Sequence, residues 1–287
     1  MRAPSTPQLA ETRIDAGWPA PSNSPVSPFD AMAAEYDSGF THSPVGTLLR
    51  AAVQRRMDAR FPAGGRILEI NCGTGEDAVY LARRGCAVVA TDISLAMTDV
   101  AREKIAAAGV AGRVDVRQAA IESLDPMELC GPAGAFDGVL SNFGGLNCLH
   151  DLAAAAEGLA GCVRPGGFAL LCVMGPLCAW EWAWYLLHGR PGKAFRRLKP
   201  GGVPWRGLTV RYPTPGRLRR SFAPHFRCVR ACAVGALIPP SYAGQWAGRH
   251  PNLLARLNAL ERRCETWPGM ATLADHYLLE MQRVAED

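Results

Sequence analysis

Acidic residues are missing from a long part of this 287-residue chain. No aspartate or glutamate occurs between Trp182 and Leu260, although this stretch carries 14 lysines and arginines. The segments before and after it are both acidic, so the net charge of +5 conceals a strong asymmetry. Charged residues of both signs normally make up about a quarter of a globular domain. We therefore expect the basic segment to face either solvent or an anionic partner.

Other absences narrow the class of protein. The ten cysteines include no C-x-x-C pair, which argues against a zinc site or a disulfide framework and predicts reduced thiols in a cytoplasmic protein without a metal. Residues 1–27 lack the continuous apolar region of a secretory signal, and their proline and serine content predicts a mobile leader. No apolar run is long enough to predict a membrane-spanning helix.

The most informative stretch runs from Arg66 to Asp92. It begins with a short apolar run that includes Glu69 and then breaks at Asn71–Gly75. Helical spacing follows from Glu76, and a second apolar run ends at Asp92. This order predicts a strand, a glycine-rich turn, a helix and a second strand, which together form one βαβ unit.

The turn in this unit predicts a nucleoside-binding site. Gly73 and Gly75 lack Cβ, so the backbone can adopt positive φ and approach a ligand closely. Asp92 ends the second strand, where such units place an acid that accepts ribose hydroxyls. The spacing Gly73-x-Gly75-x-x-Ala78 is compatible with a nicotinamide dinucleotide. Glu69 instead favours S-adenosylmethionine, because an acid there suits the cationic amino group of a methionine moiety.

Several motifs in one order resemble the class I S-adenosylmethionine-dependent methyltransferases of the small-molecule type. Glu69–Gly75 resembles their first motif, an acid followed by x-G-C-G-T-G. The F-D-x-x-A-x-x-Y-D helix at Phe29–Ser38, the D-I-S-x-x-M segment after the second strand, and the R-P-G-G turn at Arg164–Gly167 are also similar to that family. A nicotinamide-dependent oxidoreductase predicts none of these later motifs.

The resemblance implies an α/β fold for residues 28–287. We expect a doubly wound, mostly parallel seven-stranded sheet whose last strand is antiparallel, with an inserted helical lid. The lid insertions fall at about 175–213 and 235–270, and strands are predicted at 136–141, 168–173, 226–234 and 274–282. Two positions depart from the family pattern: Asn71 replaces the usual first glycine, and Ala120 replaces an acid that usually meets the adenine amino group.

The resemblance also implies the residues that hold S-adenosylmethionine and its product S-adenosylhomocysteine. Tyr36 would cover the cofactor from the leading helix, and the ends of successive strands would supply the remaining contacts. The predicted cofactor-binding set is Tyr36, Glu69, Asn71, Cys72, Gly73, Gly75, Asp77, Asp92, Ile93, Met97, Ala120, Ile121, Ser141, Asn142 and Phe143.

The implied reaction is in-line displacement of a methyl group onto a small-molecule acceptor. His150, Asn142 and Tyr36 are the predicted catalytic residues, with His150 as candidate base. The acceptor itself is predicted to meet Phe143, Asn147, Trp180, Trp184, Tyr185, His188 and Arg196. The aromatic helix at 180–187 is either an aromatic roof over the acceptor, a lid packed on the sheet or a dimer contact.

Three questions stay open at this level. The basic segment suits an anionic acceptor, an acidic carrier protein, an anionic membrane surface or plain solvation, whereas the chain has no recognisable nucleic-acid-binding module. The oligomeric state is undetermined. A cofactor-binding protein that transfers no methyl group, or that supports another reaction, is the main alternative to a methyltransferase.

Overall fold

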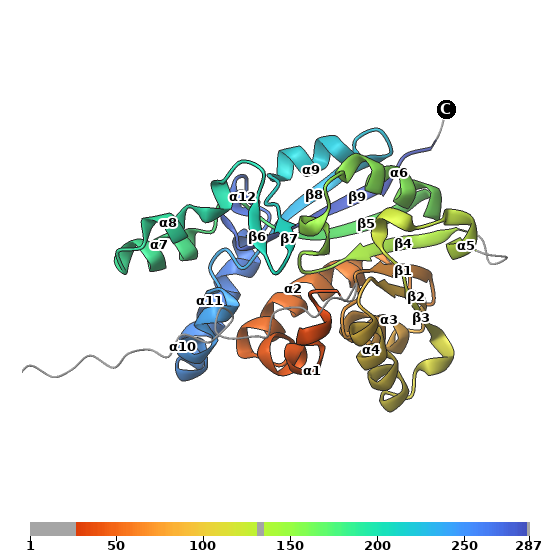
Figure 1. The fold of residues 1–287 in the computed structure, drawn as a ribbon, viewed down its shortest axis with the longest axis horizontal. Helices are drawn as coiled ribbons and strands as arrows, with labels where there is room; N and C mark the ends of the chain where they lie inside the picture. The colour runs from red at the N-terminus through yellow and green to blue at the C-terminus, as the bar shows by residue number, and fades with distance from the viewer. Residues whose placement is uncertain (1–26, 131–134, 286–287) are drawn as a thin grey trace, which may run out of the picture.

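The computed structural model describes residues 27–130 and 135–285, so nearly all of the predicted leader lies outside the described residues. Its centre is a seven-stranded sheet in the order β3-β2-β1-β4-β5-β9-β8 (Figure 1). Strands β1 to β5 pair in parallel, whereas β9 is antiparallel to β5 and β8. The predicted fold class is therefore confirmed, including the return of the last strand between the fifth and the sixth predicted strands.

The strands and helices alternate along most of the chain. The sheet consists of β1 (Arg66–Ile70), β2 (Ala87–Asp92), β3 (Val114–Gln118), β4 (Phe136–Ser141), β5 (Val163–Met174), β8 (Phe226–Val234) and β9 (His276–Arg283). The helices that cover it are α2 (Pro44–Arg60), α3 (Glu76–Arg83), α4 (Leu95–Ala107), α5 (Pro126–Cys130), α6 (Leu152–Cys162), α9 (Pro215–Phe222), α10 (Gly244–Arg249), α11 (Pro251–Cys264) and α12 (Met270–Leu273).

Alternation along the strands divides the core into two layers. In β1, Ile67 packs with α2, α3 and α4, whereas its neighbour Leu68 packs with α5, α6 and α9 on the opposite face. Both side chains are fully buried. Because the central parallel strands are covered on both faces, their apolar runs are nearly continuous in sequence. The carboxyl ends of β1, β2 and β4 are left as the common edge on which a site can form.

The N-terminal segment and the lid insertions lie at that edge. The leading helical segment comprises η1 (Asp30–Met32), α1 (Ala33–Tyr36) and the π-helical η2 (Asp37–Thr41). The first insertion contains α7 (Ala179–Leu187), α8 (Pro191–Ala194), η7 (Arg196–Leu198) and a hairpin of β6 (Val203–Trp205) and β7 (Leu208–Val210). α7 and α8 extend away from the sheet (Figure 1).

One predicted turn takes a different form. Residues 164–167 were expected to precede a strand, but they lie inside β5 as a bulge between the pairs Phe136↔Val163 and Gly138↔Phe168. The bulge arises because Gly166 adopts φ 78°, which interrupts the ladder without ending the strand.

The glycine turn generates a stability prediction. Gly75 has φ 75°, and a Cβ there would lie 2.9 Å from Ala101 Cβ on α4. Replacing Gly75 with Ala should lower the free energy of unfolding by about 2–4 kcal/mol, because backbone strain adds to overpacking. Gly109→Ala is the matched control, since Gly109 has φ 70° but open space around its Cα, and about 1 kcal/mol is expected. Equal losses in urea denaturation would contradict the packing explanation.

Candidate functional site

The turn after β1 is held in the shape that a bound nucleoside requires. Asn71, Gly73 and Gly75 all have positive φ. Asp92, at the end of β2, accepts hydrogen bonds from Gly73 N at 2.8 Å and from Ser94 N at 2.9 Å. A Cβ on Gly73 would meet no atom within 4 Å, so the turn borders open space. Each Asp92 oxygen retains a second lone pair for a ligand hydroxyl.

Glu69 is a buried acid without a partner for one of its oxygens. It lies at the end of β1, only 2% of it is exposed, and Oε2 accepts no hydrogen bond. Burial is the main reason why the pKa of Glu69 is raised well above its ordinary value, and the carboxylates of Asp77 and Asp92 add to the effect. A buried carboxyl in this state is suited to a cationic ligand group, which would restore its charge.

A second buried network connects α2, α3 and the end of β4. Arg50 forms an ion pair with Asp77, and Asn142 Nδ2 donates to the same Asp77 oxygen at 2.8 Å. Burial alone would lower the pKa of Arg50, but Asp77, with smaller contributions from Tyr36 and Glu76, raises the pKa overall. Arg50 was not predicted as a site residue. The signal in the sequence was a basic residue on the apolar face of a helix.

The end of β4 is tied directly to the glycine turn. Ser141 Oγ donates to Asn71 Oδ1 at 2.8 Å, and Asn71 Nδ2 donates to Asn142 O at 3.0 Å. Asn71 thus gives this turn a link that glycine cannot make. Phe143, with φ 50°, follows directly, and the Arg50 guanidinium lies 5.0 Å from its ring centroid.

The leading helical segment is fastened over the turn. Asp37 accepts a hydrogen bond from Thr74 Oγ1 at 2.7 Å and pairs with Lys104 Nζ at 2.7 Å. An aromatic row follows from Tyr36 to Phe40, at 5.9 Å between ring centroids, and from Phe40 to Phe143, at 5.0 Å. Burial raises the pKa of Tyr36. These contacts give the segment the position of a lid.

The residues predicted to flank adenine follow β2 and β3. Met97 is buried on α4, Ile93 is exposed, and Ala120 and Ile121 are partly buried. Cys72 is buried, and burial raises the pKa of its thiol well above the ordinary value. The adenine-flanking roles of these residues stay predictions.

Several residues predicted from the sequence are placed outside this arrangement. His150 is exposed just before α6, and His188 is exposed with its ring packed on Trp184. Asn147 is fully buried, and its side chain bonds Met174 N, Met174 O and Arg211 O. Arg196 pairs with Glu181 at 2.7 Å. Asn147 and Arg196 therefore have structural partners, whereas no contact tests the two histidines as substrate residues.

His276 is a candidate base that the sequence analysis missed. It is buried at the start of β9 and lies edge-on to Phe143, with ring centroids 5.5 Å apart. Its Nδ1 lies 3.1 Å from an oxygen of Asp275, whose other oxygen lies 2.6 Å from Arg197. The His276–Asp275 contact is an ion-pair distance rather than an aligned hydrogen bond. Arg197 lowers the pKa of Asp275 despite its burial, which keeps that carboxylate charged beside the imidazole.

Trp180, Trp184 and Tyr185 lie on α7. The first two line an apolar cavity of about 180 Å³ together with Pro239, Pro240, Tyr242, Ala243 and Trp246. Trp180 Nε1 donates to Leu237 O at 2.9 Å, which joins the two insertions. Tyr185 lies beside Tyr242, with ring centroids 6.0 Å apart.

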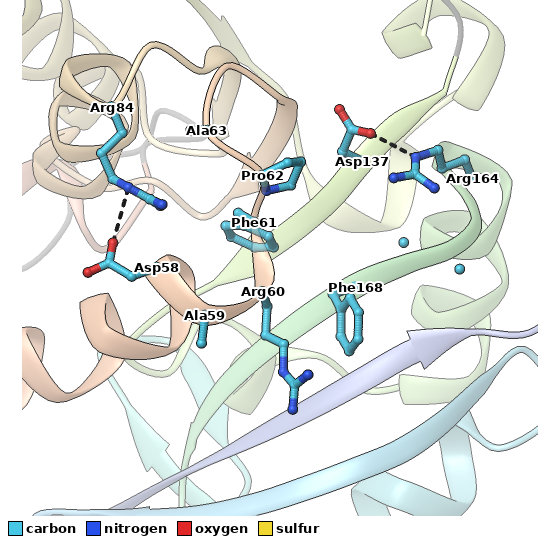
Figure 2. A pocket seen from close by; sticks show the side chains of 12 residues that line it. Asp58, Ala59, Arg60, Phe61, Pro62, Ala63, Arg84, Asp137, Arg164 and Phe168 are labelled. Carbon is cyan, nitrogen blue, oxygen red and sulfur yellow. Dashed lines mark hydrogen bonds and ion pairs between the residues drawn. The ribbon is translucent and has the colours of Figure 1, made fainter.

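A larger cavity of about 530 Å³ lies at the opposite edge of the sheet. Figure 2 shows Arg84 paired with Asp58 on one side and Arg164 paired with Asp137 on the other. The cavity adjoins residues at the amino ends of β1 and β4, so it belongs to neither the glycine turn nor the lid. Its size alone does not make it the functional site.

Together, the strand order, the glycine turn and the acids that end β1 and β2 define a Rossmann-like fold with an edge suited to a nucleoside. The methyltransferase domain family matches residues 67–167. This match agrees with the resemblance of the sequence to the class I S-adenosylmethionine-dependent methyltransferases.

The curated relatives agree with that family. The chain is 32% identical over 155 residues to the ubiquinone/menaquinone biosynthesis C-methyltransferase UbiE of Geobacter sulfurreducens, covering 50% of this chain and 55% of the relative. It is 33% identical over 146 residues to the demethylmenaquinone methyltransferase of Clavibacter sepedonicus, with the same coverage. The chain thus spans about half the length of the curated relatives it matches.

Solved structures extend the likeness of fold over most of the chain. The [4+2]-cyclase SpnF superposes with a TM-score of 0.61 at 17% identity, covering 94% of this chain and all of that one. The CcbJ methyltransferase from Streptomyces caelestis superposes with a TM-score of 0.58 at 17% identity, covering 91% and 99%. At this identity the comparison establishes the fold alone.

The buried ion pair generates a prediction about stability. Arg50→Met would leave Asp77 charged and unpaired, so the free energy of unfolding should fall by about 3–5 kcal/mol. Asp77→Asn in the same chain should recover part of that loss. Arg102→Met is the matched control, because its pair with Asp99 is exposed and contributes less than about 1 kcal/mol. Chemical denaturation measures all three, and equal losses at Arg50 and Arg102 would contradict this account.

Proposed function

We propose that the protein binds S-adenosylmethionine and transfers its methyl group to a small-molecule acceptor by in-line displacement. The supporting observation is a local excess of buried carboxyl groups over buried cations. Glu69, Asp77 and Asp92 are buried around the turn, while Arg50, paired with Asp77, is the buried cation of this cluster within the described residues. A ligand that carries an ammonium and a sulfonium group compensates that excess.

The roles of the chain's own residues follow from their positions. Glu69 would hold the amino group, Asp92 the ribose hydroxyls, and the row of Tyr36, Phe40 and Phe143 would exclude water from the reacting atoms. The bound cofactor supplies an activated methyl group on a good leaving group. The protein therefore has mainly to align the acceptor.

His276 would take a proton from an acceptor that requires one. Asp275 lies beside Nδ1, so Nε2 is the ring nitrogen that faces away from the ion pair. Charged Asp275 would orient the ring and stabilise the imidazolium that forms. Arg197 would act as a positioning residue through Asp275. An amine or carboxylate acceptor would not need this step.

For the acceptor, the aromatic cavity behind α7 supports a flat or apolar group. The relatives from Geobacter and Clavibacter are named as menaquinone methyltransferases, and a quinone ring is a flat group of this kind. The ten free cysteines suit a reducing compartment, so we place the reaction in the cytoplasm.

A second candidate function is a cofactor-bound protein that supports another reaction. The [4+2]-cyclase SpnF superposes on 94% of this chain, so a protein with this fold can be named for a reaction other than methyl transfer. Calorimetry with S-adenosylmethionine followed by a methyl-release assay on acceptor pools separates the two candidates. Binding without turnover on any acceptor would favour the second candidate, and no binding would exclude both.

Cofactor binding should depend on pH through Glu69. Because its pKa is raised in the free protein and the ammonium group needs the charged form, affinity should increase as pH rises through that pKa. Below the pKa, the gain should approach about tenfold per pH unit, with close to one proton released per cofactor bound. Calorimetry in buffers of different ionisation enthalpy measures both quantities.

Glu69→Gln tests the assignment of that proton. The variant should bind S-adenosylmethionine at least about tenfold more weakly and should lose the pH dependence, since the remaining amide cannot become charged. Glu157→Gln is the control, because Glu157 is exposed on α6. A pH dependence that survives in Glu69→Gln would show that another group releases the proton.

The two histidines can be distinguished directly. If a proton is removed from the acceptor, His276→Asn should lower kcat by about 100-fold or more while cofactor affinity stays within about twofold. His150→Asn should instead retain the wild-type kcat. The opposite pattern would restore His150 as the base, and a normal rate in both variants would indicate an acceptor that needs none.

A further inference from the structure

The outer end of the first insertion exposes large apolar side chains. We use "lid tip" for residues 186–199, which include the end of α7, α8 and η7. Leu186, Leu187, Phe195 and Leu198 are 48%, 85%, 41% and 46% exposed. They are four of the twelve large apolar residues that are exposed among the described residues, within 13 positions of sequence. Figure 1 shows α7 and α8 projecting from the rest of the molecule.

The charge of the lid tip has one sign. Arg190, Lys193 and Lys199 are exposed there, and no acidic residue occurs anywhere from Trp182 to Leu260. The last acid before this stretch, Glu181, is buried and lies 2.6 Å from Arg197 and 2.7 Å from Arg196. The Glu181 carboxylate is therefore paired inside the insertion, and the exposed charges of the lid tip are all positive.

The lid tip is held in place rather than loosely attached. Arg197 is buried and bridges Glu181 of α7 to Asp275, which precedes β9. Its Nη1 also donates to Asp275 O at 3.1 Å. Trp182 packs against Phe195 with ring centroids 5.2 Å apart. The apolar residues are thus presented to the outside by a folded element, which reduces the entropy cost of binding.

From these observations we infer that the lid tip docks on an anionic lipid bilayer. Cations interspersed with leucine and phenylalanine on a projecting element suit the boundary of an anionic bilayer. The cations can contact the lipid headgroups, while the apolar side chains insert among the acyl chains. A merely solvated basic face would leave Leu187 in water without compensation. An acidic protein would match the charges, but it would not require an outward-facing apolar tip. Among the helices of the described residues, none qualifies as a membrane span.

The test is co-sedimentation of the full-length protein with vesicles of phosphatidylcholine alone or with added phosphatidylglycerol. Binding is expected only to the anionic vesicles, and it should weaken as salt rises. Leu187→Glu should weaken binding about tenfold or more, because an inserted side chain is lost and a repulsive charge is gained. Each of Lys193→Gln and Lys199→Gln should weaken it about fivefold.

Met127→Glu is the matched control, since Met127 is 83% exposed on α5, far from the lid. It should bind vesicles as the wild type does. Absence of binding to anionic vesicles would overturn the inference. So would salt-sensitive binding that Leu187→Glu leaves unchanged, because the tip would then serve charge alone and fit an acidic protein. Cofactor affinity, measured in parallel, should be unchanged in every variant, so this test is independent of the methyl transfer proposed above.

Discussion

The structure depends on concentrating carboxylates at the carboxyl edge of a parallel sheet. Glu69 and Asp92 end neighbouring strands, and Asp77 enters from the helix between them. One buried arginine, Arg50, offsets part of this charge through Asp77. Burying like charges together is costly unless a cation joins them. We propose that this arrangement preorganises the site for a cationic nucleoside; the pKa of Glu69 is raised in the free protein, mainly by burial and further by Asp77 and Asp92.

The same constraint explains why the leading segment and α2 belong to the site although they precede the sheet. Asp37 is bonded to Thr74 and Lys104, and Arg50 of α2 pairs with Asp77 of α3. Both contacts use charge to hold an N-terminal element against the glycine turn. Phe40 then completes the aromatic row that ends at Phe143. Cofactor binding and closure of the leading helical segment over the glycine turn are therefore expected to be coupled.

The first insertion contains one buried cation that orders the structure and several exposed cations that face outward. Arg197 is a structural cation, buried between Glu181 and Asp275, and it reaches the candidate base His276 through the latter. Arg190, Lys193 and Lys199 are surface cations beside exposed leucines. In the sequence these residues form a single basic segment. Only their burial shows that one part orders the active-site edge while the other faces outward.

The sequence by itself determined the sheet, the turn and the cofactor class, because those depend on local patterns. Alternating or continuous apolar runs defined strands such as β4 and β8, and an acid-glycine-acid order within 24 residues defined the nucleoside turn. Asp92 and the positive φ of Gly73 and Gly75 agree with that derivation. The bulge in β5 was missed because a glycine-rich segment can turn or bulge with the same sequence.

Only the tertiary structure decided which distant residues meet. Arg50 and His276 looked like ordinary members of a helix and a strand, and their roles arise from contacts with Asp77 and Phe143 at separations of 27 and 133 positions. His150 was predicted because it follows β4 closely; it is exposed, and its role as a base stays a prediction. Arg196 was predicted to meet the acceptor, and only the structure showed that it pairs with Glu181. Such pairings depend on how the strands are ordered in space, which no local pattern encodes.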